Sequence, residues 1–155
     1  MPYSDSVSLV LITYNQASFI KEACLSVLNQ DGEPIEIILS DDHSTDHTFE
    51  IMQDIVSSYA GPHKVTLRQT ERNVGLIEHI NQVVDISTGQ IIVYAAGDDV
   101  SMPNRVVKTM EYFQRNKDAL IVHSSVIEID AKSDKIGICT PPIVKKSISC
   151  EKMAK

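Results

Sequence analysis

Two pairs of adjacent aspartates are the residues of this sequence most suited to chemistry. Asp98 and Asp99 follow the apolar run Ile91–Ala96 and one glycine, and Asp41 and Asp42 follow a second apolar run. Adjacent carboxylates repel each other unless water or a cation offsets their charge. Their hard oxygen atoms suit Mg²⁺ or Mn²⁺, which commonly bridge protein carboxylates to substrate phosphates. A solvated turn at a strand end is the plain alternative.

Further polar residues accompany these acids. Thr13 and Asn15 end the first apolar run, and their donors and acceptors suit a nucleotide base or ribose, as do the carboxylates at positions 41 and 42. Arg72–Gly75 could offer a cation and backbone N–H groups to a diphosphate, although a solvated glycine turn explains it equally well. Ser44–Asp46 could equally cap a helix.

Two histidines form a weaker candidate site. His43 and His47 are four residues apart and lie beside acidic residues, a pattern that could be drawn as zinc ligands. Because the spacing crosses a loop and the start of a helix, where polar residues are common, an arrangement without metal is favoured.

Alternating strands and helices are predicted to position these groups. The predicted strands cover residues 7–13, 35–39, 65–67 and 91–95, and apolar stripes with helical spacing lie at 19–30, 49–59, 77–84 and 106–113. The continuous apolar run at 91–95 predicts a central strand buried on both faces. A long strand at 119–129 and a hairpin turn at 132–135 follow, and no element is predicted after Gly137.

This alternation predicts an α/β fold, a Rossmann-like domain with a mostly parallel central sheet and helices on both faces. Ligands bind such sheets at the carboxyl ends of their strands. The tips at 13–15, 41–42 and 98–99 should therefore converge on one edge, although they lie far apart in the sequence.

Composition limits the function classes. With 155 residues, 43% of them hydrophobic, and a formal net charge of −7, the chain fits a single globular domain and not a nucleic-acid binder. Its three cysteines are far apart, which fits a reducing cytoplasm. No signal peptide and no apolar run of membrane-spanning length is present in the sequence.

Taken together, the sequence resembles the family 2 glycosyltransferases of the GT-A fold over roughly residues 6 to 125. The resemblance rests on blocks in a fixed order: Val7–Asn15, Ser26–Gln30, Ile37–Thr48, Asn73–Gly75, Asn81, Gly89, Gly97–Asp99, Pro103 and Arg105. In combination these blocks are far more specific than a lone aspartate pair.

The resemblance implies a role for each matching residue. Asp99 would bind Mn²⁺ or Mg²⁺, and Asp98 would contact the ribose or the metal. Asp42 matches the acid that reads the base, which is often uracil. The nucleotide-binding set is completed by Thr13, Tyr14, Asn15 and Asn73.

The resemblance also implies an activity. Such enzymes transfer a sugar with inversion from a nucleoside-diphosphate sugar, here expected to be a UDP-sugar, to an acceptor hydroxyl. The acceptor would be a glycan or a lipid-linked glycan in polysaccharide biosynthesis. The full-length protein would be cytoplasmic and could associate peripherally with the inner face of the membrane.

One departure concerns the catalytic base, an Asp or Glu that the family carries beyond the metal motif. The later acids of this chain do not match that context; they are Glu128, Asp130, Asp134 and Glu151. The base is therefore expected beyond Lys155. Residues 1–155 are expected to form one nucleotide-sugar-binding domain that is truncated before the acceptor-binding part and could bind donor without turnover.

Two other functions remain as alternatives. A sugar-phosphate nucleotidylyltransferase would need a glycine-rich loop with Arg or Lys after the first strand, where Tyr14–Ala17 stands instead. A catalytically inactive nucleotide-binding or scaffolding domain on the same fold is left open.

Overall fold

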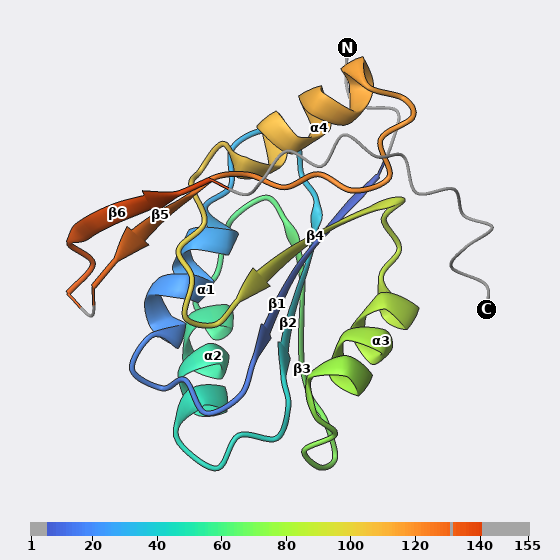
Figure 1. Ribbon diagram of the computed structural model, residues 1–155. Helices are drawn as coiled ribbons and strands as arrows, with labels where there is room; N and C mark the ends of the chain where they lie inside the picture. The colour runs from blue at the N-terminus through green and yellow to red at the C-terminus, as the bar shows by residue number, and fades with distance from the viewer. Residues whose placement is uncertain (1–5, 131, 141–155) are drawn as a thin grey trace. The chain divides into compact units, whose positions relative to one another are not determined.

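The computed structural model describes residues 6–130 and 132–140, which fall into two compact units that meet between Arg115 and Asn116 (Figure 1). Strands and helices alternate through the first unit. They are β1 (Val7–Thr13), α1 (Ile20–Leu28), β2 (Glu36–Asp41), α2 (Thr48–Ser57), β3 (Lys64–Gln69), α3 (Leu76–Ile86), β4 (Ile91–Ala96) and α4 (Arg105–Arg115). The second unit contains β5 (Val126–Ile129) and β6 (Lys135–Cys139).

The first unit contains one parallel sheet in the order β3-β2-β1-β4. This confirms the predicted fold class, a parallel α/β sheet flanked by helices. β1 lies inside the sheet, with Thr13 beside Asp41 of β2 and Ile12 beside Ala96 of β4. The carboxyl ends of three strands therefore lie next to one another.

Alternating side chains of the strands build a core on each face of the sheet. Leu9 and Leu11 of β1 belong to the larger core, to which α1, α2 and α4 contribute. Val10 points to the other face and packs with Ile38 and with Val83 of α3. Figure 1 shows α1 and α2 on the opposite side of the sheet from α3. Each fully buried aliphatic side chain contributes roughly 1.5–3 kcal/mol, which anchors the strand ends above it.

The prediction that residues 91–95 form a central strand is wrong for the sheet that the structure describes. β4 is an edge strand there, and Tyr94 is 37% exposed. Val93 and Ala95 are buried on one face and half-buried Ile92 packs on the other, so the apolar run does not require a neighbouring strand on both sides.

The predicted long strand at 119–129 is also wrong in its first half. Only Val126–Ile129 is a strand, and it pairs antiparallel with β6. Leu120 and Ile121 are 68% and 71% exposed and have no partner strand within the described chain. Apolar character alone does not make a strand, because the backbone also needs a pairing partner.

The predicted turn between these strands is confirmed. Asp130 Oδ1 accepts hydrogen bonds from the N–H groups of Lys132 and Asp134. Strand β6 extends past Gly137, which the fading periodicity did not predict. Residues 141–155 lie outside the described residues. No helix within 6–130 or 132–140 has the length and apolar character to cross a bilayer.

Candidate functional site

The loops that follow β1, β2 and β4 are joined directly to one another. Asp42 N donates to the carbonyl oxygen of Thr13 at 2.9 Å, and Gly97 N donates to the carbonyl oxygen of Ile12 at 3.0 Å. The predicted convergence of the three strand ends is therefore present at the level of the backbone.

Gly97 lets the loop with the two aspartates lie against the loop after β1. A Cβ atom at this position would lie 2.4 Å from both Thr13 Oγ1 and Gln16 Oε1. These two side chains are themselves hydrogen-bonded at 2.7 Å, and Thr13 is only 4% exposed. The Thr13 hydroxyl, predicted to bind nucleotide, thus lies between these two loops and donates to Gln16.

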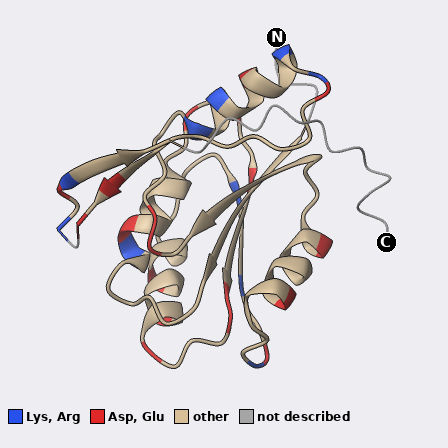
Figure 2. Ribbon diagram, in the orientation of Figure 1, with Lys and Arg blue, Asp and Glu red and all other residues tan. Residues whose placement is uncertain are grey.

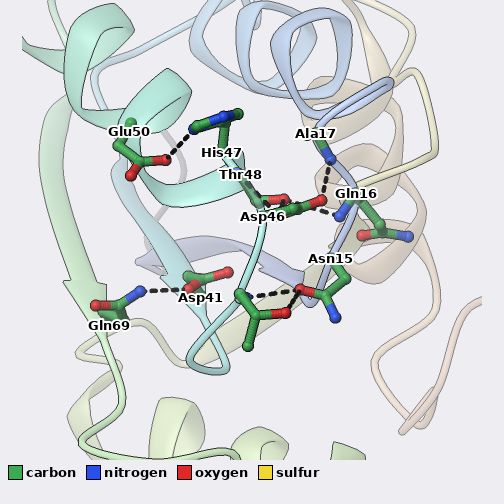
Figure 3. A network of polar contacts seen from close by, with 10 residues as sticks. Asn15, Gln16, Ala17, Asp41, Asp46, His47, Thr48, Glu50 and Gln69 are labelled. Atoms are coloured by element: carbon green, nitrogen blue, oxygen red, sulfur yellow. Dashed lines mark hydrogen bonds and ion pairs between the residues drawn. The ribbon is translucent and has the colours of Figure 1, made fainter.

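The loops after β1 and β2 hold each other through side chains (Figure 3). Asn15 Oδ1 accepts from Thr45 N at 2.8 Å, Asp46 Oδ2 accepts from Ala17 N at 3.1 Å, and Gln16 N donates to a threonine of α2 at 2.8 Å. Asn15 has a positive φ of 52°, which asparagine tolerates better than most residues. Its amide nitrogen makes no hydrogen bond among the described residues, and the neighbouring Tyr14 is exposed.

Asp41 is a structural residue. It is fully buried, and its carboxylate accepts hydrogen bonds from Ser44 N and from Gln69 Nε2, both at 2.8 Å. A buried carboxylate needs such donors, because an unpaired charge in the interior is costly. Asp41 therefore joins the end of β2 to β3 and shapes the turn that follows.

Asp42 holds a different loop. It is 3% exposed, and it accepts hydrogen bonds from Thr70 Oγ1 at 3.1 Å and from the N–H groups of Val74 and Gly75 at 2.9 Å. This carboxylate thereby fixes the loop that carries exposed Asn73 at the edge of the site. Oδ2 accepts one of these bonds and Oδ1 two, so Oδ2 keeps acceptor capacity that a base N–H could use.

His79 lies buried beneath these acids, a placement that the sequence did not distinguish from ordinary packing. One ring nitrogen, Nε2, lies 2.6 Å from Ser40 Oγ. Burial lowers the pKa of His79; Asp42 and Asp41 act to raise it, and Arg68 to lower it. A neutral imidazole under the site follows from this balance.

Asp98 and Asp99 differ from the other acids because both side chains are exposed. Asp99 N closes a turn onto the carbonyl oxygen of Ala96 at 3.2 Å. Neither carboxylate accepts a hydrogen bond from any residue of the described chain. These are the free oxygen ligands that a divalent ion requires.

The donor set fits Mg²⁺ or Mn²⁺ better than zinc. Within the described residues no group of three or more His, Cys, Asp or Glu side chains could hold a metal. Mg²⁺ is typically bound by one or two carboxylates together with water and phosphate oxygens. His43 Nδ1 lies 2.9 Å from the carbonyl oxygen of Thr70, and His47 pairs with Glu50, so the two histidines do not form a joint site.

The segment after the two aspartates is held by the end of α1, a role that sequence reasoning missed. Ser26 Oγ accepts from Ser101 N at 3.0 Å, and Gln30 Nε2 donates to the carbonyl oxygen of Met102 at 3.0 Å. Gln30 Oε1 also accepts from Val106 N at 3.2 Å. Ser26 and Gln30 were part of the family resemblance, but no chemical feature of the sequence indicated this function.

Comparison with known families and proteins agrees with this geometry. The family model described as Glycosyl transferase family 2 matches residues 8–147. An uncharacterized glycosyltransferase of Methanocaldococcus jannaschii is 30% identical over 126 residues, which are 80% of this chain and 42% of the relative. EpsE of Bacillus subtilis is 29% identical over 130 residues, which are 84% of this chain and 46% of the relative. The chain thus spans less than half the length of these relatives.

Solved structures share the fold at low identity. TarS of S. aureus, residues 1–349 in complex with UDP, superposes with a TM-score of 0.63 at 22% identity, covering 72% of this chain and 33% of that one. The mannosyltransferase PcManGT from Pyrobaculum calidifontis, in complex with GDP-Man and Mn²⁺, gives a TM-score of 0.62 at 24% identity, covering 71% and 32%. The shared fold is the GT-A fold.

Proposed function

The chain belongs to glycosyl transferase family 2, and we propose that its first unit binds a nucleoside-diphosphate sugar for transfer of the sugar to an acceptor hydroxyl. One observation carries the proposal. Asp98 and Asp99, which are exposed and have no partner among the described residues, lie on the same sheet edge as the loops after β1 and β2. The relatives' complexes with UDP, and with GDP-Man and Mn²⁺, support a donor of this class.

The nucleoside would lie over the loops after β1, β2 and β3. Asn15 offers an amide nitrogen and Tyr14 an exposed ring, and exposed Asn73 directly precedes Val74, whose N–H donates to the carboxylate of Asp42. A uracil base presents an N–H donor between two carbonyl acceptors, which suits the remaining acceptor of Asp42 next to amide donors. These roles, and a contact of Thr13 with the ribose, stay predictions.

Asp99, with Asp98, would hold a divalent ion against the diphosphate. A bound divalent ion neutralises the charge that develops on a leaving diphosphate. The exposed turn keeps both carboxylates free to meet the ion, since no hydrogen bond from the described chain occupies them. Asp98 would share the ion or contact the ribose.

The remaining features of the activity are proposed on the resemblance alone. They are inversion at the anomeric carbon, a glycan or lipid-linked acceptor, a catalytic base beyond Lys155, and a cytoplasmic protein that meets the membrane peripherally. The proposal for this chain is donor binding, which can be tested without an acceptor.

Thermal unfolding with UDP and Mn²⁺ tests the proposal. At a ligand concentration about 100-fold above the Kd, binding stabilises by about 2.7 kcal/mol, which corresponds to a rise in Tm of roughly 5–10 °C for a domain of this size. Asp99→Asn should abolish the part of the rise that depends on Mn²⁺. Asp85→Asn, an exposed site on α3, should keep it.

Each outcome has a meaning. An unchanged wild-type Tm with UDP, GDP and other nucleoside diphosphates, with and without Mn²⁺, would contradict donor binding and favour the scaffolding alternative. If the Mn²⁺-dependent part of the rise in Tm survives in Asp99→Asn, the ion site lies elsewhere.

A further inference from the structure

Arg105 spans the two ends of the loop that carries the aspartates. Its Nη2 donates to the carbonyl oxygen of Tyr94 at 2.5 Å, and its Nη1 donates to Ser101 Oγ at 2.9 Å. Tyr94 lies in β4 before the loop, and Ser101 follows it. One side chain from the start of α4 therefore ties both ends of the loop together.

Ser101, one of the two acceptors of Arg105, is itself held in place by α1. Ser101 is 4% exposed, and its N–H donates to Ser26 Oγ of α1 at 3.0 Å. Ser26 Oγ donates in turn to the carbonyl oxygen of Ala23 at 2.7 Å. Arg105 thus links the edge strand β4, through Ser101, to helix α1 on the other side of the loop.

The charge of Arg105 faces Asp99 without forming a direct pair with it. Burial lowers the pKa of Arg105, and the carboxylate of Asp99 acts to raise it. The ion pairs found in the described chain do not include these two residues. The guanidinium therefore gives its hydrogen bonds to Tyr94 and Ser101 and leaves the carboxylate oxygens available to a cation.

We propose that Arg105 is a positioning residue that preorganises the Asp98–Asp99 loop for a divalent ion. It holds the loop closed and offsets the repulsion between two adjacent carboxylates before the ion binds. This inference rests on the proposed metal site and adds a residue to which no binding role was assigned.

Two effects of removing Arg105 oppose each other. Loss of a positive charge would by itself favour a cation, but water at the exposed Asp99 screens that repulsion. Loss of two hydrogen bonds from a charged donor would remove the link across the loop, so that ion binding must order the loop more than in the wild type. The second effect should dominate, and the ion should bind more weakly.

The test is isothermal titration of UDP into the full chain with and without Mn²⁺. Arg105→Met should weaken binding in the presence of Mn²⁺ about tenfold and change the metal-free Kd less than twofold. Arg105→Lys should fall between, since an ammonium keeps the charge but lacks the fork that reaches both acceptors. Arg115→Met is the matched control, because Arg115 is exposed on the same helix and pairs with Glu111 at 3.8 Å.

The outcomes separate this inference from the proposed function. If Mn²⁺ does not strengthen UDP binding by the wild type, the metal site itself fails. If the wild type responds to Mn²⁺ and Arg105→Met responds equally, only the role of Arg105 is overturned. An equal loss with and without Mn²⁺ would mean a purely structural role and would also overturn it. If Arg105→Met does not fold, an unchanged Mn²⁺ response of Arg105→Lys decides against the inference.

Discussion

At the scale of single residues, neighbouring acids of similar appearance have different environments. Asp41 and Asp42 are buried and bonded to protein donors, whereas Asp98 and Asp99 are exposed and accept no hydrogen bond from the described residues. A carboxylate that already has protein donors stabilises a loop, and an exposed one without donors is available for a cation. Burial and hydrogen bonding, and not residue type, separate the two pairs.

His79 should make stability depend on pH. Its pKa is lowered in the folded protein relative to the ordinary value of 6.5, chiefly by burial, with Asp42, Arg68 and Asp41 facing it. Below pH 6.5 the unfolded chain therefore binds more protons than the folded one, and the free energy of unfolding decreases as the pH falls.

The measurement compares urea unfolding of the wild type and His79→Gln between pH 7 and pH 5. The wild type should lose more stability than the variant over this range, because glutamine does not titrate. Parallel pH curves would contradict the assignment, since other titrating groups contribute equally to both proteins.

Asp46 should contribute measurably to stability. Burial acts to raise its pKa, but hydrogen bonds from Thr48 and from Ala17 N dominate and lower it, so that the carboxylate is charged at neutral pH. Asp46→Ala removes acceptors for both loops and should cost about 1–3 kcal/mol. The loss should shrink in acid, as the pH falls through the lowered pKa and Asp46 is protonated in the wild type as well.

Chemical denaturation at neutral pH provides the measurement. Asp54→Ala is the control, since Asp54 is exposed on the same helix α2 and its replacement should change stability by less than about 0.5 kcal/mol. Equal effects of the two substitutions would show that the contacts in Figure 3 carry little stability.

At the scale of elements, two glycines at opposite ends of β4 allow a controlled comparison. A Cβ at Gly97 would lie 2.6 Å from Thr13 Cβ at the site, and a Cβ at Gly89 would lie 2.3 Å from Ser8 N at the far end of β1. Each alanine should destabilise the fold by about 1–3 kcal/mol through overpacking.

Only Gly97→Ala should also weaken nucleotide binding. It must push the loop with the aspartates away from the loop after β1, whereas Gly89→Ala acts at the amino ends of the strands. Titration of the folded variants with UDP and Mn²⁺ measures the difference. Equal affinities would mean that the spacing between these two loops does not matter for the ligand.

At the scale of the whole molecule, acidic residues outnumber basic ones, with 21 Asp and Glu against 14 Lys and Arg. The formal net charge is −7, and Figure 2 shows red acidic segments at several loops along the lower edge of the first unit. A divalent ion would be needed there to offset a diphosphate. This charge balance is compatible with the proposed nucleotide-sugar donor, whose diphosphate a divalent ion would neutralise.

The first unit should fold and bind alone. All buried residues of its two cores lie between Val7 and Met110. A shortened protein that ends at Arg115 should therefore unfold in one cooperative transition and keep the binding of UDP with Mn²⁺. Circular dichroism melts and titration measure this. Loss of binding in a folded shortened protein would show that the second unit contributes to the site, in line with the prediction that residues 1–155 form one domain.

The sequence by itself determined the order of elements, the parallel α/β fold, the family and the three sets of strand-end residues. These follow from local patterns: β-branched runs, helical apolar spacing and motifs in a fixed order. The same reliance on local patterns made the prediction of a strand at 119–129 wrong in its first half. Its apolar run predicted strand pairing that Leu120 and Ile121 do not make in the described chain.

Only the tertiary structure decided what each polar residue touches. Asp42 contacts Val74 and Gly75 more than thirty residues away, and Arg105 reaches back to Tyr94 across the loop that it closes. Whether a carboxylate is satisfied depends on donors brought by other strands and helices, and local sequence does not encode their distance. The acids were visible in the sequence, but packing decided which of them accept hydrogen bonds within the described chain.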